Sequence, residues 1–338
     1  MRKRVLTVED LRVTLPVPAG SLRAVQGVSF HVDRGETLCI VGESGCGKSL
    51  TALAIMGLLP AQADRRAARL DVEGQDITNL PERAMSDIRG NRMAMIFQEP
   101  MTSLNPAYSI GDQLQEALRR HRRVSNRDAR ARAIELLDRV GITAATSRLK
   151  QYPHQLSGGL RQRVMIAMAL MCQPALILAD EPTTALDVTI QAQILHLLAR
   201  LQREFAMGLI LITHDLGIVA RIATRVVVMY AGQVVETGSA SAVFSAPKHP
   251  YTRGLLACIP VPGRTRRGAP LGTIPGLVPS LVGELDGCHF ARRCPHAVDA
   301  CRAAAVPLET AGDGHPIRCI RHRELTPGVL STPPVVVA

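Results

Sequence analysis

Nine consecutive residues have the types and the spacing that bind phosphate. They are Gly42, Glu43, Ser44, Gly45, Cys46, Gly47, Lys48, Ser49 and Leu50. The apolar run Thr37–Val41 before them predicts a strand, and Ser49–Leu59 predicts a helix. Glycines let backbone N–H groups turn toward phosphate oxygens, and the start of a helix adds about half a positive charge there. We expect Lys48 to reach the β and γ phosphates of a nucleotide and Ser49 to bind Mg²⁺.

Two adjacent carboxylates follow a second apolar stretch, in the segment ALILADEP. Leu176–Ala179 predicts a buried strand, and Asp180 and Glu181 come directly after it. Ligands gather at the carboxyl ends of parallel strands. One carboxylate is therefore expected in the Mg²⁺ shell, and the next can polarise a water for in-line attack on the γ-phosphate. A surface acidic pair is the alternative, and the phosphate loop upstream argues against it.

The segment LSGGLRQRVMIAMAL, Leu156–Leu170, offers a third phosphate-binding feature. Ser157, Gly158 and Gly159 open a predicted helix, so they bring a hydroxyl, backbone amides and the positive end of the helix dipole. With these three motifs the chain resembles the nucleotide-binding subunits of ABC transporters, whose signature is LSGG. The resemblance implies that this helix closes over the ATP of a second subunit, so that a dimer holds two ATP molecules.

The same resemblance implies roles for three further residues. Gln98, in MIFQEP, corresponds to the glutamine that contacts Mg²⁺ and senses the γ-phosphate, and Asp187, in TTALD, to the aspartate that communicates across the dimer. His214, in LILITHDL, corresponds to the histidine that contacts the γ-phosphate. One family feature is missing, because no aromatic residue that could stack on adenine precedes Phe30. We expect Leu15 or a nearby aliphatic side chain in its place, with weaker recognition of the base.

The order of the predicted elements indicates an α/β fold. Strands are predicted at Leu209–Thr213 and Val226–Met229, and helices at Ile190–Phe205 and Leu216–Ala223. The resemblance implies an ABC-type P-loop ATPase core with an antiparallel β subdomain and a helical subdomain, plus a small, irregular, cysteine-rich C-terminal extension. The predicted boundaries are 1–245 for the nucleotide-binding domain, about 98–172 for its helical subdomain, 246–325 for the extension, and 326–338 for a disordered tail.

Two further stretches narrow the resemblance. HPYTRGLL, His249–Leu256, and FQEPMTSLNP, Phe97–Pro106, resemble the ATPases of oligopeptide and dipeptide importers. This branch implies two transmembrane permease subunits, a second and non-identical ABC ATPase subunit, and an extracytoplasmic solute-binding protein. It also implies a peripheral position at the cytoplasmic face of the bacterial inner membrane. The chain itself has neither the apolar region of a signal peptide nor an apolar run long enough to span a bilayer.

The composition leaves a second class of function to weigh. The net charge of +11 and the clustered cysteines would suit a soluble ABC ATPase that acts on nucleic acid or the ribosome. The single cassette and the importer-like extension favour transport instead, without a nucleic-acid partner. A regulatory cassette without catalysis is opposed by Lys48, Glu181 and His214. The transported solute stays open, since peptides are the default of the branch but other small solutes use it.

Four of the eight cysteines cluster near the end of the chain. Cys288, Cys294, Cys301 and Cys319 have the spacing C-x5-C-x6-C-x17-C. A reducing compartment disfavours disulfides, and the remaining alternatives are four buried thiols or a metal site. Structural zinc favours closer cysteine pairs, although histidines could complete the set: His289, His296 or His315.

A 4Fe–4S cluster needs four thiolates and tolerates wider spacing. The resemblance also associates this extension with such a cluster, which we therefore expect, with zinc as the alternative. Nearby arginines would offset the thiolate charge: Arg292, Arg293, Arg302, Arg318 and Arg321. The expected role is to staple a segment with little apolar core, because ligation energy can replace burial.

Overall fold

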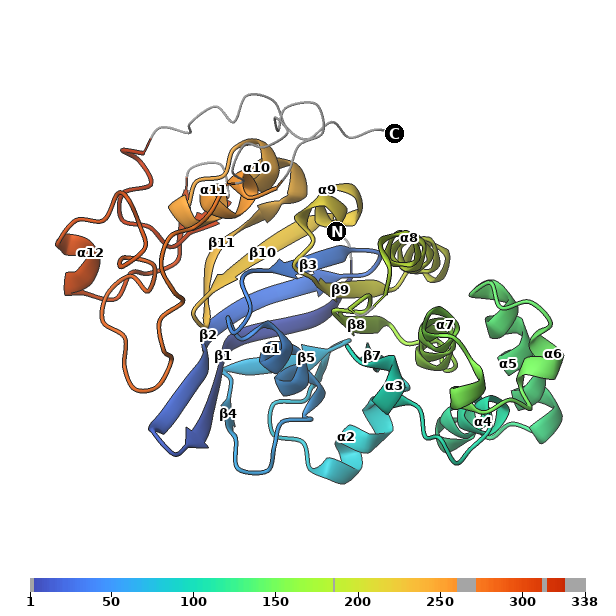
Figure 1. The fold of residues 1–338 in the computed structure, drawn as a ribbon. Coiled ribbons are helices and arrows are strands. Elements are labelled where there is room, and N and C mark those ends of the chain that lie inside the picture. Colours follow the sequence, from blue (N-terminus) through green and yellow to red (C-terminus); the bar gives the residue numbers. More distant parts are fainter. Residues whose placement is uncertain (1–2, 185, 260–271, 312–314, 326–338) are drawn as a thin grey trace. The chain divides into compact units, whose positions relative to one another are not determined.

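A computed structural model describes residues 3–184, 186–259, 272–311 and 315–325 of the chain. The predicted tail at 326–338 lies outside these residues. The chain divides into two compact units (elements labelled in Figure 1). The first contains Met1–Thr7, His31–Glu36 and Leu70–Ile212, and the second contains Val8–Phe30, Thr37–Arg69 and Thr213–Ala338. Among the described residues, none of the helices combines the length and the apolarity that crossing a membrane requires.

Three parallel strands pair side by side in the first unit. They are β7 (Met93–Ile96), β8 (Leu176–Asp180) and β9 (Gly208–Ile212). β8 lies between the other two, with Ile96 opposite Ala179 and Asp180 opposite Ile212. Every residue of β8 and β9 is buried, and apart from Asp180 at the end of β8 their sequences are apolar without alternation, as expected for parallel strands covered on both faces.

Helices make up most of the rest of the first unit. They are α2 (Glu82–Ile88), α3 (Pro100–Ser103), α4 (Ile110–His121), α5 (Asn126–Arg139), α6 (Ala145–Arg148), the 3₁₀ turn η1 (Pro153–Gln155), α7 (Gly158–Ala169) and α8 (Val188–Phe205). Ser109 and Ser125 cap α4 and α5 by accepting hydrogen bonds from the backbone N–H groups of Asp112 and Asp128. α4, α5 and α7 pack together in the stretch for which the sequence predicts a helical subdomain.

The second unit contains the strand that leads into the phosphate loop. β3 (Thr37–Val41) pairs in parallel with β10 (Arg225–Tyr230), and β10 pairs antiparallel with β11 (Gln233–Ser239). Two short strands from the extension, β13 (His315–Ile317) and β12 (Glu309–Ala311), continue this sheet antiparallel from β11. The helices are α1 (Lys48–Met56), α9 (Leu216–Ile222), α10 (Ala240–Ser245), α11 (Pro250–Ala257) and α12 (Ala300–Ala303).

The predicted antiparallel β region is also present. β1 (Arg4–Val17) and β2 (Gly20–Asp33) are neighbours, and each contributes residues to both units. In the second unit β1 pairs antiparallel with β4 (Asp64–Arg66), and in the first unit β5 (Arg69–Val72) pairs antiparallel with β6 (Gln75–Asp76). Phe30, expected in the core, is 8% exposed.

Several element boundaries differ from the sequence predictions. The helix expected at Ser49–Leu59 ends earlier, because Gly57 adopts the left-handed conformation and its N–H bonds back to the carbonyl oxygens of Leu53 and Ala54. α8 starts at Val188 instead of Ile190, since Asp187 caps it. β8 includes Asp180, which the sequence placed beyond the strand.

Candidate functional site

The phosphate loop lies in the second unit between β3 and α1. Gly42 and Gly47 have φ angles of 152° and 91°. A Cβ atom at either position would lie 2.2 Å from a backbone oxygen, that of Met229 at Gly42 and that of Ala24 at Gly47. Only glycine fits such close approaches at these angles. The loop conformation therefore depends on the residue type that the motif requires.

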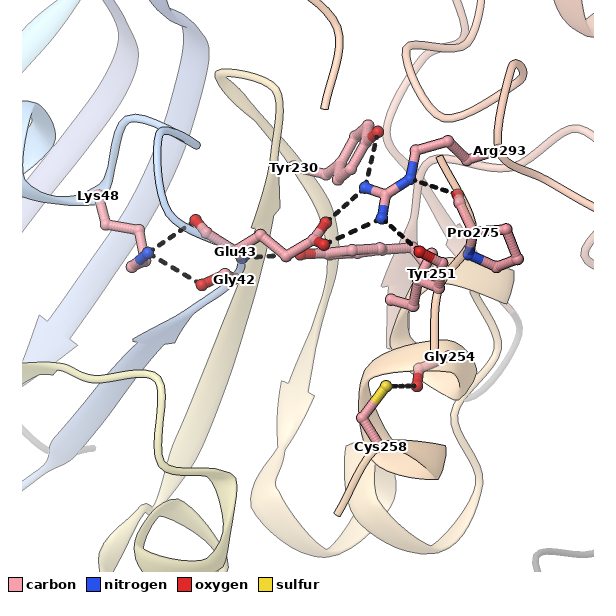
Figure 2. A network of polar contacts seen from close by, with 10 residues as sticks. Gly42, Glu43, Lys48, Tyr230, Tyr251, Gly254, Cys258, Pro275 and Arg293 are labelled. Atoms are coloured by element: carbon pink, nitrogen blue, oxygen red, sulfur yellow. Dashed lines mark hydrogen bonds and ion pairs between the residues drawn. The ribbon is translucent and has the colours of Figure 1, made fainter. Parts of the chain in front are cut away.

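Lys48 lies at the first turn of α1, folded back over the loop. It is 5% exposed, and its Nζ atom donates to the carbonyl oxygens of Gly42 and Glu43, both at 2.9 Å (Figure 2). Gly47, at the N-cap of α1, has no side chain to bond the first-turn N–H groups, which leaves them for an anion. Ser49 and Leu50 follow in the same turn and are half-buried.

The other residues of the motif differ in exposure. Ser44 and Gly45 are exposed, while Cys46 is buried and donates its N–H to the carbonyl of Glu43. Burial raises the pKa of the Cys46 thiol, which opposes a nucleophilic role at neutral pH. The loop thus presents backbone N–H groups, an ammonium and a hydroxyl, the set that binds the phosphates of a nucleotide.

Asp180, Glu181 and Gln98 lie in the first unit at the ends of β8 and β7. Asp180 is the last residue of β8 and is 5% exposed. Glu181 follows with a φ of 41°, and its N–H donates to the carbonyl of Ile212 at 3.0 Å. Its Oε2 atom accepts hydrogen bonds from Gln98 Nε2 at 3.3 Å and from Thr184 Oγ1 at 3.1 Å. The structure thus joins two residues that lie far apart in the sequence and for which the sequence predicts a shared function.

Two exposed helix starts in the first unit carry the other motif residues. Ser157 caps α7 by accepting from Leu160 N–H, and Gly158 and Gly159 form the first turn. Asp187 caps α8, with its Oδ1 atom 2.9 Å from the nitrogen of Ile190. Both starts have the exposed polar groups that contact with a second nucleotide-bound subunit would require.

His214 lies in the second unit, exposed, between β9 and α9. The preceding Thr213 donates its N–H to Ile40 of β3 at 3.4 Å, and the following Asp215 caps α9 through Ile218 N–H at 3.1 Å. The turn that carries His214 is therefore attached to the strand that leads into the phosphate loop. The joint action of the residues of the two units stays a prediction of the sequence.

The four clustered cysteines converge on one cavity of the second unit. Its lining includes Cys288, Cys294, Cys301 and Cys319, with His249 and Phe290 beside them. Burial raises the pKa of Cys288 and Cys294, and raises that of Cys319 to about 11, while nearby thiolates act in the same direction. All eight cysteines lie in the described part of the chain, and none is in a disulfide.

The cavity does not have the arrangement of a mononuclear metal site. Within the described ranges, no group of three or more His, Cys, Asp or Glu side chains is placed to hold a metal ion. Two histidines considered as zinc ligands bond elsewhere, His289 to the carbonyl of Ala231 at 2.9 Å and His315 to Glu236 at 2.8 Å. Neither His289 nor His315 lines the cysteine cavity, whereas His296 does, so these contacts do not support the zinc alternative for the first two.

The arginines of this segment have different partners, and Arg318 and Arg321 lie close enough to the cysteines to interact with their charge. Arg302 forms an ion pair with Asp299, and Arg321 forms one with Glu324. Arg293 turns to the phosphate loop, where its Nη1 and Nη2 atoms lie 2.6 and 3.0 Å from the two carboxylate oxygens of Glu43 (Figure 2). No local pattern in the sequence links these two residues, which are 250 positions apart.

Comparisons with known proteins agree with this geometry. A family model described as "ABC transporter" matches residues 25–184. A dimeric post-hydrolysis structure of the ATP-binding cassette MJ0796 bound to ADP and Pi is similar, with a TM-score of 0.62 and 26% identity, over 70% of this chain and 98% of that one. CbiO1 from Clostridium perfringens gives a TM-score of 0.61 at 27% identity, over 72% and 91%. The class of the fold is thus an ATP-binding cassette.

The remaining comparisons show which group of ATP-binding cassettes the chain resembles. A second family model, "Oligopeptide/dipeptide transporter, C-terminal region", matches residues 235–301. A protein of Brucella abortus (strain 2308), whose name describes a peptide import ATP-binding protein, is 52% identical over 96% of this chain and 99% of its own. The dipeptide transport ATP-binding protein DppD of Escherichia coli (strain K12) is 49% identical over 93% and 96%. The chain belongs to the peptide-import family of ABC transporter ATP-binding proteins.

Proposed function

We propose that the chain is the ATP-hydrolysing subunit of an ABC importer for peptides or related small solutes. The observation that carries this proposal is the pair of family matches, in which the cassette at residues 25–184 is followed by the C-terminal region of the peptide transporters at residues 235–301. The alternative, a soluble ABC ATPase acting on nucleic acid or the ribosome, is not favoured by any of these relatives.

The proposed chemistry assigns one task to each group of residues. Gly42–Ser49 binds the phosphates of ATP, with Lys48 as the charged partner of the β and γ phosphates. Ser49, Gln98 and Asp180 are the proposed holders of Mg²⁺, which neutralises phosphate charge when bound. Glu181 accepts a hydrogen bond from the attacking water and acts as its general base. His214 contacts the γ-phosphate. The existing contact between Gln98 and Glu181 supports a shared role for these two side chains.

The proposed partners follow from the family. Ser157, Gly158, Gly159 and Asp187 would contact the ATP and the loop of a second ABC ATPase, which we propose to be non-identical. Closure of this dimer on ATP would drive two permease subunits, to which an extracytoplasmic binding protein delivers the solute. The chain would then act peripherally, at the cytoplasmic face of the inner membrane.

We also propose a 4Fe–4S cluster on the four cysteines of the extension. One observation of the structure motivates it, the cavity that all four cysteines line. Within the described ranges no group of three or more ligands is placed to hold a metal ion, so the proposal rests on the number and shared cavity of the thiols. Cys288, Cys294, Cys301 and Cys319 would supply the four thiolates that such a cluster requires. Its contribution would be to hold the extension together.

The decisive test of the proposed function compares two variants in the assembled transporter. Glu181→Gln should retain Mg-ATP binding but hydrolyse it at least about 100-fold more slowly, because the water loses its acceptor. Lys48→Ala should lose ATP affinity instead. Glu204→Gln, an exposed glutamate at the end of α8, is the matched control and should hydrolyse ATP normally. Wild-type turnover in Glu181→Gln would remove this residue from catalysis.

A further inference from the structure

We propose that Arg293 is a positioning residue for nucleotide binding, one that anchors and neutralises Glu43 inside the phosphate loop. This inference rests on the proposed function of that loop. Arg293 belongs to the cysteine-rich segment, directly before Cys294, and lies outside the nucleotide-binding motifs. Its contacts lie entirely within the second unit.

The contact between Arg293 and Glu43 has the geometry of a two-point clamp. Nη1 donates to Oε2 at 2.6 Å and Nη2 donates to Oε1 at 3.0 Å (Figure 2). The Arg293 side chain is 4% exposed and the Glu43 side chain 28%. Bidentate pairs of this kind fix orientation as well as charge, and burial reduces their screening by salt. The pair is therefore more than a surface ion pair.

The guanidinium is itself held from the opposite side. Its Nε atom donates to the carbonyl of Pro275 at 2.9 Å and Nη2 to that of Ile274 at 3.0 Å. Nη1 also lies 3.3 Å from the hydroxyl of Tyr230, and the guanidinium lies over that ring at 5.7 Å from its centroid. Because these contacts fix the guanidinium in addition to those with Glu43, Arg293 has little freedom to move away from Glu43.

Glu43 is bound through its main chain as well. Its N–H donates to the hydroxyl of Tyr251 at 2.8 Å, and its carbonyl accepts from Lys48 Nζ at 2.9 Å. Tyr251, Tyr230 and Phe290 form an aromatic cluster, with ring centroids 4.6 to 5.4 Å apart and no more than 2% exposure. The residue whose carbonyl holds the phosphate-binding lysine is thus fixed to a rigid cluster and to Arg293.

The negative charge of Glu43 explains why the contact with Arg293 should affect the binding of an anionic ligand. An unpaired carboxylate in a phosphate-binding loop repels the phosphates of ATP, and partial burial strengthens that repulsion. Arg293 cancels this charge and holds the carboxylate against the extension. Without Arg293 the loop would keep Lys48 but add an uncompensated negative charge next to it. ATP affinity should fall while the chemistry carried out by Glu181 stays unchanged.

The test measures Mg-ATP binding to the full-length chain by calorimetry. Arg293→Ala should weaken binding about tenfold, equivalent to about 1.4 kcal/mol. Arg293→Lys should give an intermediate value, since lysine keeps the charge but not the two-point fork. The double variant Glu43→Gln with Arg293→Ala should recover to within about threefold of wild type, because no charge is left unpaired. A merely structural role of Arg293 would not produce this recovery.

Two controls separate the possible failures. Arg292→Ala removes the exposed neighbouring arginine and should bind Mg-ATP as wild type does. Lys48→Ala should abolish binding, and a wild-type chain that does not bind Mg-ATP would defeat the proposed function rather than this inference. Wild-type affinity in a folded Arg293→Ala protein would overturn the inference. So would a double variant as weak as Arg293→Ala alone, since Arg293 would then act through groups other than Glu43.

Discussion

Replacing Glu236 by glutamine should destabilise the second unit far more than the small change of atoms suggests. Glu236 lies on β11 with 0% exposure. Its Oε1 atom accepts from Lys248 N–H at 2.7 Å and lies 2.8 Å from His315 Nε2, and its Oε2 atom accepts from His249 N–H at 3.0 Å. This carboxylate therefore joins β11 to the start of α11 and to β13, both of which belong to the extension.

The expected loss follows from counting donors. A carboxylate offers acceptors on both oxygens, whereas the glutamine amide offers one oxygen and one nitrogen that donates. In Glu236→Gln at least one of the three N–H groups would face another donor and lose its bond. A hydrogen bond to a charged group contributes roughly 1.5–3 kcal/mol, and a buried donor without a partner costs roughly 1–3 kcal/mol more. The free energy of unfolding should fall by about 3 kcal/mol.

Urea unfolding can measure this loss. The chain has no tryptophan, so tyrosine fluorescence is the signal, with circular dichroism as the global one. The fluorescence change on unfolding should come mainly from the buried Tyr230 and Tyr251, because the other two tyrosines are already exposed. Glu135→Gln is the matched control, because Glu135 is 43% exposed and pairs with arginines on α5; its loss should stay below about 1 kcal/mol. A Glu236→Gln protein within about 1 kcal/mol of wild type would refute the reasoning.

The remaining predictions concern acid, metal, partners and the phosphate loop. Burial alone would raise the pKa of Glu236, but hydrogen bonds from His315 and two backbone amides hold it below 4.5, so its contribution is complete above pH 4.5 and is lost as the pH falls through the folded value. The stability difference between wild type and Glu236→Gln should therefore shrink in acid unfolding series below that pH. Protein purified without oxygen should be brown with about four irons per chain, and Cys294→Ser should bleach it and loosen the extension; colourless protein with about one zinc would replace the cluster by a zinc staple. Cysteines introduced within Glu99–Asn105 should cross-link to a permease subunit in membranes, whereas capture of nucleic acid would support the soluble alternative. Gly47→Ala should abolish Mg-ATP binding in calorimetry because its Cβ would meet a backbone oxygen at 2.2 Å, while Gly45→Ala, with nothing within 4 Å, should bind more strongly than Gly47→Ala.

Much of the fold was predictable because its signals are local. The glycines and Lys48 of the phosphate loop, the apolar run that becomes β8, and the serine and aspartate caps of α7 and α8 all lie within a few residues of the structure they specify. The predicted boundaries of helices and strands differ from the observed ones by one to three residues. They arose where a cap or a left-handed glycine, such as Gly57, ended an element before the apolar pattern did.

The contacts of the extension were not predictable in the same way. The contacts of Arg293 with Glu43 and of His315 with Glu236 join residues far apart in the sequence. They depend on the tertiary fold, which the hydrophobic periodicity of a local segment does not predict. The abundance of arginine near the cysteines even favoured the wrong partner, since charge balance with thiolates was the simplest local explanation. Tertiary packing instead directed Arg293 toward a carboxylate in the predicted phosphate loop.

The separation of 250 residues between Glu43 and Arg293 has a consequence for how the protein is made. A ribosome adds roughly 5–20 residues per second, so the phosphate loop emerges roughly 10–50 s before the arginine that clamps it. During that interval Glu43 lacks its arginine partner, and the role proposed for Arg293 implies a reduced affinity of the loop for ATP. The nascent chain therefore reaches full nucleotide affinity only when nearly all of it has been synthesised. A fragment that stops before residue 293 would contain every motif of an ATPase and still bind ATP poorly.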